Sequence, residues 1–234
     1  MDKKAWIIFV TIVVVLFGGL IFLSRQNKVD VGTIDTNAIQ AATAESGNIA
    51  DHVFGKADSK VILVEYGDYQ CPGCGSLYPS LKTLSEKYQD QIAFVFRNFP
   101  LTSLHPNALA AAAAAEAAGL QGKYWEMHNK LYETQSAWES ASPEERGSTF
   151  LGYATELGLN GDTFTSDLAK NTISMKISFD QALGKKIGVD STPTVYLDGT
   201  KLTQETWADS TKLDAAIQAE LKEHNIALPT DTTK

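Results

Sequence analysis

The sequence lacks what two common protein classes require. It contains only two cysteines in 234 residues, which excludes a scaffold held by several disulfides and a zinc site built from three or four thiolates. Basic residues are outnumbered, with 20 Lys and Arg against 28 Asp and Glu and a formal net charge of -8. Nucleic acid is therefore not expected as a partner, because binding phosphates needs a basic surface.

Long uncharged stretches are scarce as well, and one stands out. Residues 5–23 contain no charge, and about 20 apolar residues are what a transmembrane helix needs. A cleaved signal peptide usually has a shorter apolar region with small residues soon after it, whereas Arg25 and Lys28 follow here. We predict an uncleaved transmembrane anchor within residues 1–28 and keep a cleaved signal peptide as the alternative.

Composition divides the rest of the chain into three parts. Residues 29–51 are polar and show no sustained period, which predicts a flexible tether between the membrane and a folded domain. Residues 52–226 hold the regular hydrophobic patterns, and residues 227–234 read as a short C-terminal tail. The hydrophobic content of 44% is enough to fill the core of one domain of this size.

The folded domain opens with the pattern of a strand, a helix and a second strand. Residues 61–66 and 92–96 are apolar runs typical of strands that are buried on both faces. Between them, apolar side chains recur on one face of a helix, at Leu77, Leu81, Leu84 and Tyr88. This order predicts a parallel pairing of the two strands in an α/β fold.

The second half of the domain is rich in helical patterns and ends in a hairpin. Residues 107–118 are nearly all alanine, the best helix former, and further helical patterns follow. Strand character returns at residues 194–197, where Asp198-Gly199 predicts a tight type I′ turn. A last helix is expected over residues 205–222.

The two cysteines form the motif Cys71-Pro72-Gly73-Cys74 between the first strand and the helix after it. If the helix begins near Pro72, Cys71 lies at its start and faces solvent, while Cys74 lies one turn inside and is covered. The two sulfurs are then close enough for a disulfide. Free backbone N–H groups and the helix dipole stabilise a thiolate on Cys71. A thiolate of low pKa is a nucleophile and a good leaving group, which predicts redox chemistry.

Two other interpretations of the cysteine pair remain. An inert disulfide would close so short a loop that it would add little stability. The thiols could also hold a metal ion together with His105 or His128, although the four histidines are scattered and none pairs with another at helical spacing. We favour redox chemistry over metal binding.

Two further places carry information about a site. Glu65 interrupts the first apolar run, where a carboxylate is costly unless it has a task; the alternative is a strand-end side chain that points to solvent. Pro193 stands just before a predicted strand and cannot donate to the sheet there, which leaves an approachable edge. By itself, Thr192-Pro193-Thr194 is also a simple strand entry.

Together these motifs resemble those of the DsbA-type thioredoxin-fold proteins. The Cys-Pro-Gly-Cys motif after a strand, Glu65 six residues earlier, and Thr192-Pro193 before a hairpin form a specific combination. The helical block over about residues 98–188 is similar to the inserted helical domain of that family, in its membrane-anchored bacterial branch. The resemblance covers residues 52–222 and implies a thioredoxin fold with an inserted helical domain.

The resemblance also implies a role for each residue of the site. Cys71 would form the mixed disulfide with a substrate, Cys74 would resolve it, and Glu65 would exchange a proton with Cys74. Pro193 would be a cis-proline facing the Cys71–Cys74 disulfide. Thr192 would present backbone groups that pair with an extended substrate strand.

The function implied is that of a thiol:disulfide oxidoreductase that introduces disulfide bonds into exported proteins. It would lie on the extracytoplasmic side of a bacterial cytoplasmic membrane, oxidise reduced or unfolded substrates, and be reoxidised by a membrane quinone-linked thiol oxidase. It would need no metal and no cofactor beyond its redox-active disulfide. Gly73 stands where DsbA proteins often carry a histidine that stabilises the thiolate, so a reductase or isomerase remains an alternative. A copper-binding chaperone of thioredoxin fold and a redox sensor are the alternatives from other classes.

Overall fold

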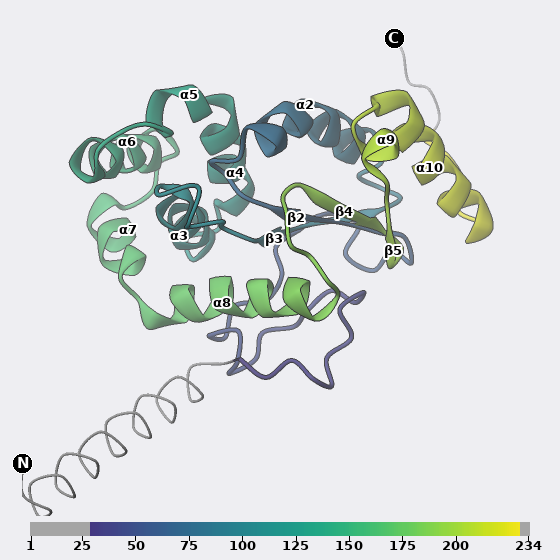
Figure 1. Ribbon diagram of the computed structural model, residues 1–234, viewed down its shortest axis with the longest axis horizontal. Helices are drawn as coiled ribbons and strands as arrows, with labels where there is room; N and C mark the ends of the chain where they lie inside the picture. Colours follow the sequence, from purple (N-terminus) through teal and green to yellow (C-terminus); the bar gives the residue numbers. More distant parts are fainter. Residues whose placement is uncertain (1–28, 230–234) are drawn as a thin grey trace, which may run out of the picture. The chain divides into compact units, whose positions relative to one another are not determined.

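A five-stranded sheet forms the centre of the computed structural model, which describes residues 29–229 (Figure 1). The strands are β1 (Val53–Gly55), β2 (Ile62–Gly67), β3 (Ala93–Asn98), β4 (Thr194–Leu197) and β5 (Thr200–Lys201). Their order in the sheet is β1-β3-β2-β4-β5. The central strands β2 and β3 are parallel, and every other neighbouring pair is antiparallel. The predicted parallel pair is confirmed.

Most of the helices follow β3 without interruption by a strand. Helix α2 (Pro72–Lys87) connects β2 to β3, and the block between β3 and β4 holds α3 (Ala108–Gly119), α4 (Tyr124–Glu133), α5 (Gln135–Trp138), α6 (Pro143–Glu156), α7 (Gly161–Leu168) and α8 (Asn171–Lys186). After β5 come α9 (Gln204–Trp207) and α10 (Ser210–Glu223). The helical block lies within the predicted range of 98–188.

Helices cover both faces of the sheet, with α2 and α10 on one face and α8 on the other (Figure 1). The first layer is held by apolar side chains at helical spacing, which pack on those of the strands: Leu77, Leu81 and Leu84 of α2, and Leu213, Ile217 and Leu221 of α10. A second core cluster lies among the helices of the inserted block and includes Cys71 and Cys74. The cysteine motif therefore stands where the sheet and the helical block meet.

The end of the domain agrees with the sequence at the hairpin and differs from it in the last helix. Asp198 and Gly199 have φ angles of 46° and 77°, and both values suit the predicted type I′ turn. The single helix expected over residues 205–222 is divided into α9 and α10. The division falls at Asp209, which has extended backbone and caps α10 by accepting hydrogen bonds from Thr211 N and Lys212 N.

The segment predicted as a flexible tether, residues 29–51, is bound to the domain from Val31 onward. Lys186 Nζ donates hydrogen bonds to the carbonyl oxygens of Val31 and Ile34, at 3.0 and 2.6 Å. Arg97 donates to the carbonyl oxygens of Thr36 and Ala38, at 2.6 and 2.7 Å. The prediction of a flexible tether is wrong, because cationic side chains from the domain donate hydrogen bonds to the carbonyl oxygens of this segment. The segment's own polar composition does not reveal these contacts.

The membrane prediction concerns residues outside the described part of the chain. Within residues 29–229, no helix has the length and apolar character needed to cross a membrane. The predicted anchor, residues 1–28, lies outside the described residues, and so do residues 230–234 of the predicted tail.

Candidate active site

Helix α2 begins at the cysteine motif, as the sequence predicts. Cys71 is its N-cap, with an extended backbone and no side-chain capping hydrogen bond, and Pro72 occupies the first turn. Both cysteines are free thiols. Cys74 is fully buried, and Cys71 is only 7% exposed, so Cys71 is more covered than the expected solvent-facing position. The cover comes from parts of the chain far away in sequence.

The loop before the motif is held by Asp68. Its carbonyl oxygen accepts a hydrogen bond from Cys71 N at 3.0 Å, and its backbone N–H donates to Cys74 Sγ at 3.5 Å. Its buried carboxylate accepts hydrogen bonds from Gln70 N and Leu101 N, both at 2.8 Å. Asp68 therefore positions both thiols through its backbone while its side chain anchors the loop.

Gln135, on α5 of the helical block, also holds the motif in place. Its side-chain amide donates to the carbonyl oxygens of Tyr69 and Cys71, at 2.7 and 3.0 Å. This approach requires a glycine at position 75, since a Cβ on Gly75 would lie 2.5 Å from Gln135 Oε1. No spacing along the chain signals the contact, because the two residues are 60 positions apart.

The loop before β4 closes over the cysteines from the other side. The Thr192–Pro193 peptide bond is cis, as the resemblance implies. Cys71 Sγ donates a hydrogen bond to the Thr192 carbonyl oxygen at 3.3 Å. A Cβ on Gly73 would lie 3.1 Å from Pro193 Cδ and 3.6 Å from Cys71 Sγ. Tertiary structure thus brings together Cys71, Gly73 and the Thr192–Pro193 pair.

Glu65 is buried beneath the motif, with 2% of its surface exposed. The alternative of a solvent-facing strand end is therefore wrong. Its Oε1 atom is buried and makes no hydrogen bond to any residue of the described chain. Space for the carboxyl group depends on Gly67, where a Cβ would lie 3.0 Å from Glu65 Oε1 and 2.2 Å from the ring of Phe96. Burial raises the pKa of Glu65 from 4.5 to about 8, although a hydrogen bond with Cys74 acts in the opposite direction.

The two thiols have different pKa values because their surroundings differ. A hydrogen bond from Cys74 is the main reason why the pKa of Cys71 falls from 9.0 to about 5; burial opposes it, and Thr192 and the backbone N–H groups of Cys74 and Gly73 assist. Burial raises the pKa of Cys74 well above its ordinary value, and its contacts with Cys71 and Glu65 add to this. Near neutral pH the reduced site therefore holds a thiolate on Cys71 and a thiol on Cys74.

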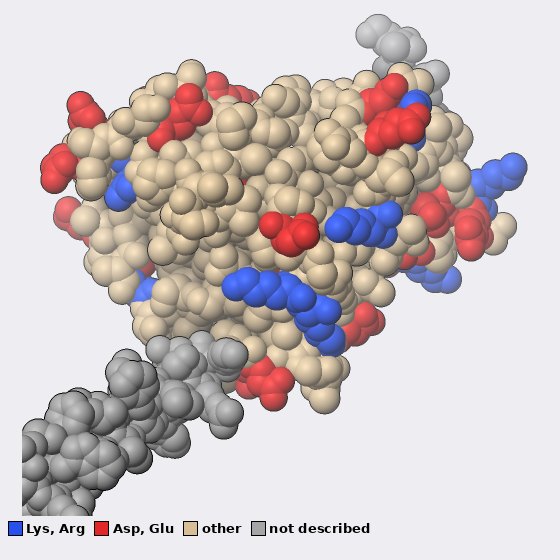
Figure 2. Space-filling model, viewed as in Figure 1, with Lys and Arg blue, Asp and Glu red and all other residues tan. Residues whose placement is uncertain are grey.

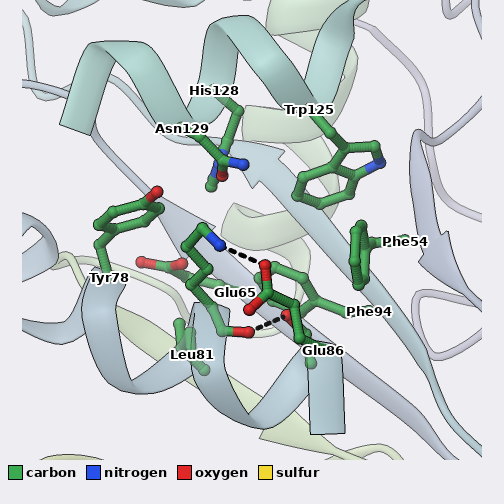
Figure 3. Close-up of a pocket in the computed structure, with 11 residues that line it drawn as sticks. Phe54, Glu65, Tyr78, Leu81, Glu86, Phe94, Trp125, His128 and Asn129 are labelled. Carbon is green, nitrogen blue, oxygen red and sulfur yellow. Dashed lines mark hydrogen bonds and ion pairs between the residues drawn. The ribbon is translucent and has the colours of Figure 1, made fainter. Parts of the chain in front are cut away.

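A small cavity lies beside Glu65, between the sheet, α2 and α4 (Figure 3). Its volume of about 20 Å³ is enough for one water molecule. The polar residues that line it include Glu65, Tyr78, Lys82, Glu86, His128 and Asn129. In the sequence His128 is a candidate metal ligand, and no spacing along the chain indicates its place beside Glu65.

The structure does not gather histidines around the two cysteines. His105 Nδ1 lies 2.8 Å from a carboxylate oxygen of Asp68, and His128 lines the cavity. Within residues 29–229, one group of three potential metal ligands has its ligand atoms within 4.8 Å of one another. This group consists of Asp198, Glu220 and His224 and contains neither cysteine.

Comparison with known proteins adds the family. The model of a family described as thioredoxin matches residues 47–219, which is most of the chain. The chain belongs to this thioredoxin family.

Among solved structures, the oxidised BdbD of Bacillus subtilis is similar with a TM-score of 0.65 and 24% identity, over 79% of this chain and 98% of BdbD. A thioredoxin-like oxidoreductase from Silicibacter pomeroyi is similar with a TM-score of 0.60 and 26% identity, over 74% of this chain and 92% of that one. The predicted thioredoxin fold with an inserted helical region, as in DsbA-type proteins, is confirmed.

Curated relatives of this thioredoxin-family chain are much longer proteins. A Na⁺/H⁺ antiporter, NhaA 1 of Salinispora arenicola, is 40% identical over 151 residues, which make up 64% of this chain and 22% of the antiporter. NhaA 1 of Mycolicibacterium vanbaalenii is 32% identical over 171 residues, or 72% of this chain and 26% of that protein. The chain thus spans about a quarter or less of the length of these two relatives.

Proposed function

We propose that this thioredoxin-family protein is a thiol:disulfide oxidoreductase that introduces disulfide bonds into exported proteins. The observation that carries the proposal is the asymmetry of the motif. The pKa of Cys71 is lowered to about 5, and the pKa of Cys74 is raised well above its ordinary value. A disulfide whose accessible sulfur is a good leaving group is a strong oxidant, because its reduced form is stabilised.

The reaction starts from the proposed Cys71–Cys74 disulfide. A substrate thiolate attacks Cys71 Sγ, the bond between the two protein sulfurs breaks, and a mixed disulfide forms between the substrate and Cys71. Cys74 leaves as a thiolate and takes a proton from Glu65, whose carboxyl group is protonated at neutral pH because burial raises its pKa to about 8. Glu65 therefore acts as the buried acid of this step.

The second step releases the product. A second thiolate of the substrate attacks its own sulfur in the mixed disulfide, and Cys71 departs as a thiolate. The pair of electrons taken from two substrate thiols now resides in the reduced Cys71 and Cys74. The interactions that lower the pKa of Cys71 to about 5 favour this departure, which drives the exchange toward an oxidised substrate.

The surroundings of the motif suit an extended, unfolded substrate. A groove of about 390 Å³ opens beside the cis-proline, lined by Pro193, Leu202 and Trp207 among others. Thr192, which precedes Pro193, has its carbonyl oxygen 3.3 Å from Cys71 Sγ. Figure 2 shows uncharged residues over the upper part of the viewed face, around α2, with acidic and basic side chains nearer its middle.

The site consumes its disulfide in each cycle and needs an external oxidant. We propose a membrane quinone-linked thiol oxidase as this partner, and a location on the extracytoplasmic side of a bacterial cytoplasmic membrane through the predicted anchor in residues 1–28. The chemistry supports this location, because protein disulfides form and persist outside the cytosol. Cysteine-labelling reagents that do not cross membranes, applied to intact cells, should modify Cys71 in the reduced protein.

The direction of the reaction is tested by equilibrating the protein with glutathione redox buffers. An oxidase should show a reduction potential well above that of thioredoxin, and a value near about -270 mV would instead establish a reductase. Direct titration with copper is the matching test for the metal-binding alternative, which predicts tight binding that is lost in the Cys71→Ser variant.

Substrates are identified by trapping. In the Cys74→Ala variant the Cys71 thiolate can attack a disulfide of an exported protein, and no second thiol of the enzyme can release the mixed disulfide, so exported proteins should accumulate in disulfide linkage to Cys71. The double variant Cys71→Ser, Cys74→Ala is the matched control and should trap nothing. Recovery of the same proteins with both variants, or of none with either, would contradict the proposed function.

A further inference from the structure

Two residues that line the same small cavity each carry a buried polar atom without a hydrogen-bond partner in the described part of the chain. Glu65 Oε1 and His128 Nε2 are both buried, and neither makes a hydrogen bond within the described chain. Both residues line the cavity of about 20 Å³ between the sheet, α2 and α4. Figure 3 shows His128 and Asn129 reaching in from α4 on one side, with Glu65 on the sheet side. Buried polar atoms almost always have a partner, which is often an ordered water.

The orientation of His128 makes Nε2 an acceptor. Its other ring nitrogen, Nδ1, lies 3.2 Å from Asn129 Oδ1, and this contact assigns the ring proton to Nδ1. Burial lowers the pKa of His128 to about 4, so the ring is neutral and Nε2 carries a lone pair. The ring is held by aromatic neighbours with centroids 4.9 to 6.3 Å away, namely Tyr69, Tyr78, Phe96, Tyr124, Trp125 and Tyr132.

The cavity also has a side toward solvent. Lys82 and Glu86 line it there and form an ion pair in which their side chains are 33% and 50% exposed. The remaining titratable group of the lining is Tyr78, whose hydroxyl group donates to Glu133 Oε1 at 3.0 Å. A water in the cavity therefore has Glu65 and His128 on its inner side and an exposed pair of charged side chains on its outer side.

We propose that one water molecule bound between Glu65 Oε1 and His128 Nε2 carries protons between Glu65 and solvent, and that His128 is the residue that positions it. The proton-transfer role rests on the proposed function, in which Glu65 gives its proton to Cys74. The protonated carboxyl group donates to the water, and the water donates to Nε2 of the neutral ring. After Glu65 loses its proton, the water supplies a new one and is itself reprotonated from solvent past Lys82 and Glu86. His128 does not change its charge in this sequence.

The water itself is tested without any activity measurement. A crystal structure of the wild-type reduced protein should show one ordered water within hydrogen-bond distance of both atoms. Infrared difference spectra should show the carboxyl C=O band of Glu65 shifted in His128→Leu, which removes the acceptor, and close to wild type in His128→Gln, which keeps one. An empty cavity in the wild-type crystal, or an unshifted band in His128→Leu, would overturn the inference even if the proposed function holds.

The role of the water is tested by single-turnover reduction of the disulfide with a small dithiol, followed from pH 5 to pH 9. His128→Leu should slow the step that protonates Cys74 by about 10- to 100-fold, at or below the lower end of what a positioned proton-transfer group contributes. His128→Gln should restore most of the rate. His224→Leu, at a half-exposed histidine that pairs with Asp198, is the matched control and should keep the wild-type rate and pH profile.

The outcomes separate the two proposals. If wild-type protein does not exchange disulfides but the water and the shifted Glu65 band are found, the proposed function fails and the water site stands. If exchange is normal and the pH profile of His128→Leu equals that of wild type, the proton route is wrong. Melting curves show whether His128→Leu is folded, and His128→Gln supplies the comparison if it is not.

Discussion

The two faces of the central strands bury ionisable groups in opposite ways. Side chains alternate between the faces of a sheet, so Glu65 and its neighbour Tyr66 in β2 point to opposite sides. In β3, Phe96 pairs in register with Glu65, and Arg97 pairs with Tyr66. The face beneath α2 and α4 holds the reactive site, and the face toward α8 holds a buried ionic network.

In the network toward α8, each buried carboxylate has a cationic partner. Asp51 accepts from Arg97 Nη2 at 2.8 Å and from Lys176 Nζ at 2.8 Å, and Lys176 also donates to Asp180 at 2.7 Å. Although burial acts to raise it, the pKa of Asp51 is lowered to about 2 by Lys176 and Arg97. Asp51, Arg97 and Lys176 keep their charges near neutral pH and tie the segment before β1 to the domain. Burial raises the pKa of Asp180 to about 6, although Lys176 opposes the rise.

The reactive face lacks such pairing. Glu65 has no ion-pair partner within residues 29–229, and burial raises its pKa to about 8. The difference between Asp51 and Glu65 teaches what decides the role of a buried carboxylate. Two cationic partners make Asp51 a fixed charge, whereas Glu65 without them can exchange a proton near neutral pH. Each of the following predictions tests this contrast.

The largest effect is expected on the paired face, from Arg97→Met. The change leaves the buried carboxylate of Asp51 with one cation fewer, and breaking a buried ion pair costs about 3–5 kcal/mol in the free energy of unfolding. Urea denaturation measures the loss. Lys82→Ala, which breaks an exposed ion pair, is the control and should cost less than about 1 kcal/mol. A loss as small as this in Arg97→Met would contradict the structural role of the network.

A somewhat smaller effect of opposite sign is expected on the reactive face, from Glu65→Gln. Between pH 4.5 and about 8 the folded protein keeps a proton on Glu65 that the unfolded chain releases, so this group lowers stability as pH rises. Each pH unit above 4.5 costs the folded protein about 1.4 kcal/mol. Removing the carboxyl group should therefore raise the free energy of unfolding by roughly 3 kcal/mol at pH 7.

The measurement compares reduced wild type and reduced Glu65→Gln by denaturation from pH 5 to pH 8. Cys71 contributes with the opposite sign, because its lowered pKa of about 5 adds stability as pH rises toward 9, and taking the difference between the two proteins largely removes this contribution. A difference that does not grow with pH would show that Glu65 is ionised in the folded protein.

A smaller effect is expected from Thr192→Val. This variant tests whether a neutral hydroxyl group stabilises the thiolate of Cys71 on the reactive face. The Thr192 hydroxyl is buried and makes no hydrogen bond to the described residues, and Thr192 assists in lowering the pKa of Cys71. Its loss should raise that pKa by about one unit, or about 1.4 kcal/mol. The ultraviolet absorbance of the thiolate against pH gives the value. An unchanged pKa would assign the effect to Cys74 and the backbone alone.

The smallest effect is expected from Gly73→His, which adds the side-chain donor that many DsbA proteins carry. The pKa of Cys71 is already about 5 without it, so the reduction potential should rise by less than about 30 mV, the equivalent of one pKa unit. Equilibration with glutathione buffers measures the change. A much larger increase would mean that Cys74 and the backbone N–H groups stabilise the thiolate less than the structure indicates.

Local features of the chain could be predicted because their causes lie close together in sequence. Pro72 in the first turn favours the start of α2 just after Cys71. The turn at Asp198-Gly199 follows from the φ angles that these residues tolerate. The two central strands follow from their apolar runs. The roles of Glu65 and Pro193 came from the resemblance to a family, since spacing alone left other interpretations open.

The rest was decided by contacts between residues far apart in sequence. Gln135 reaches the carbonyl oxygen of Cys71, His128 shares a cavity with Glu65, and Arg97 holds the segment that composition predicted to be a flexible tether. The sequence by itself determined which groups could react and where the elements begin. Only the tertiary structure decided which of these groups are buried and which have partners, and burial and partners set the pKa values on which the proposed chemistry depends.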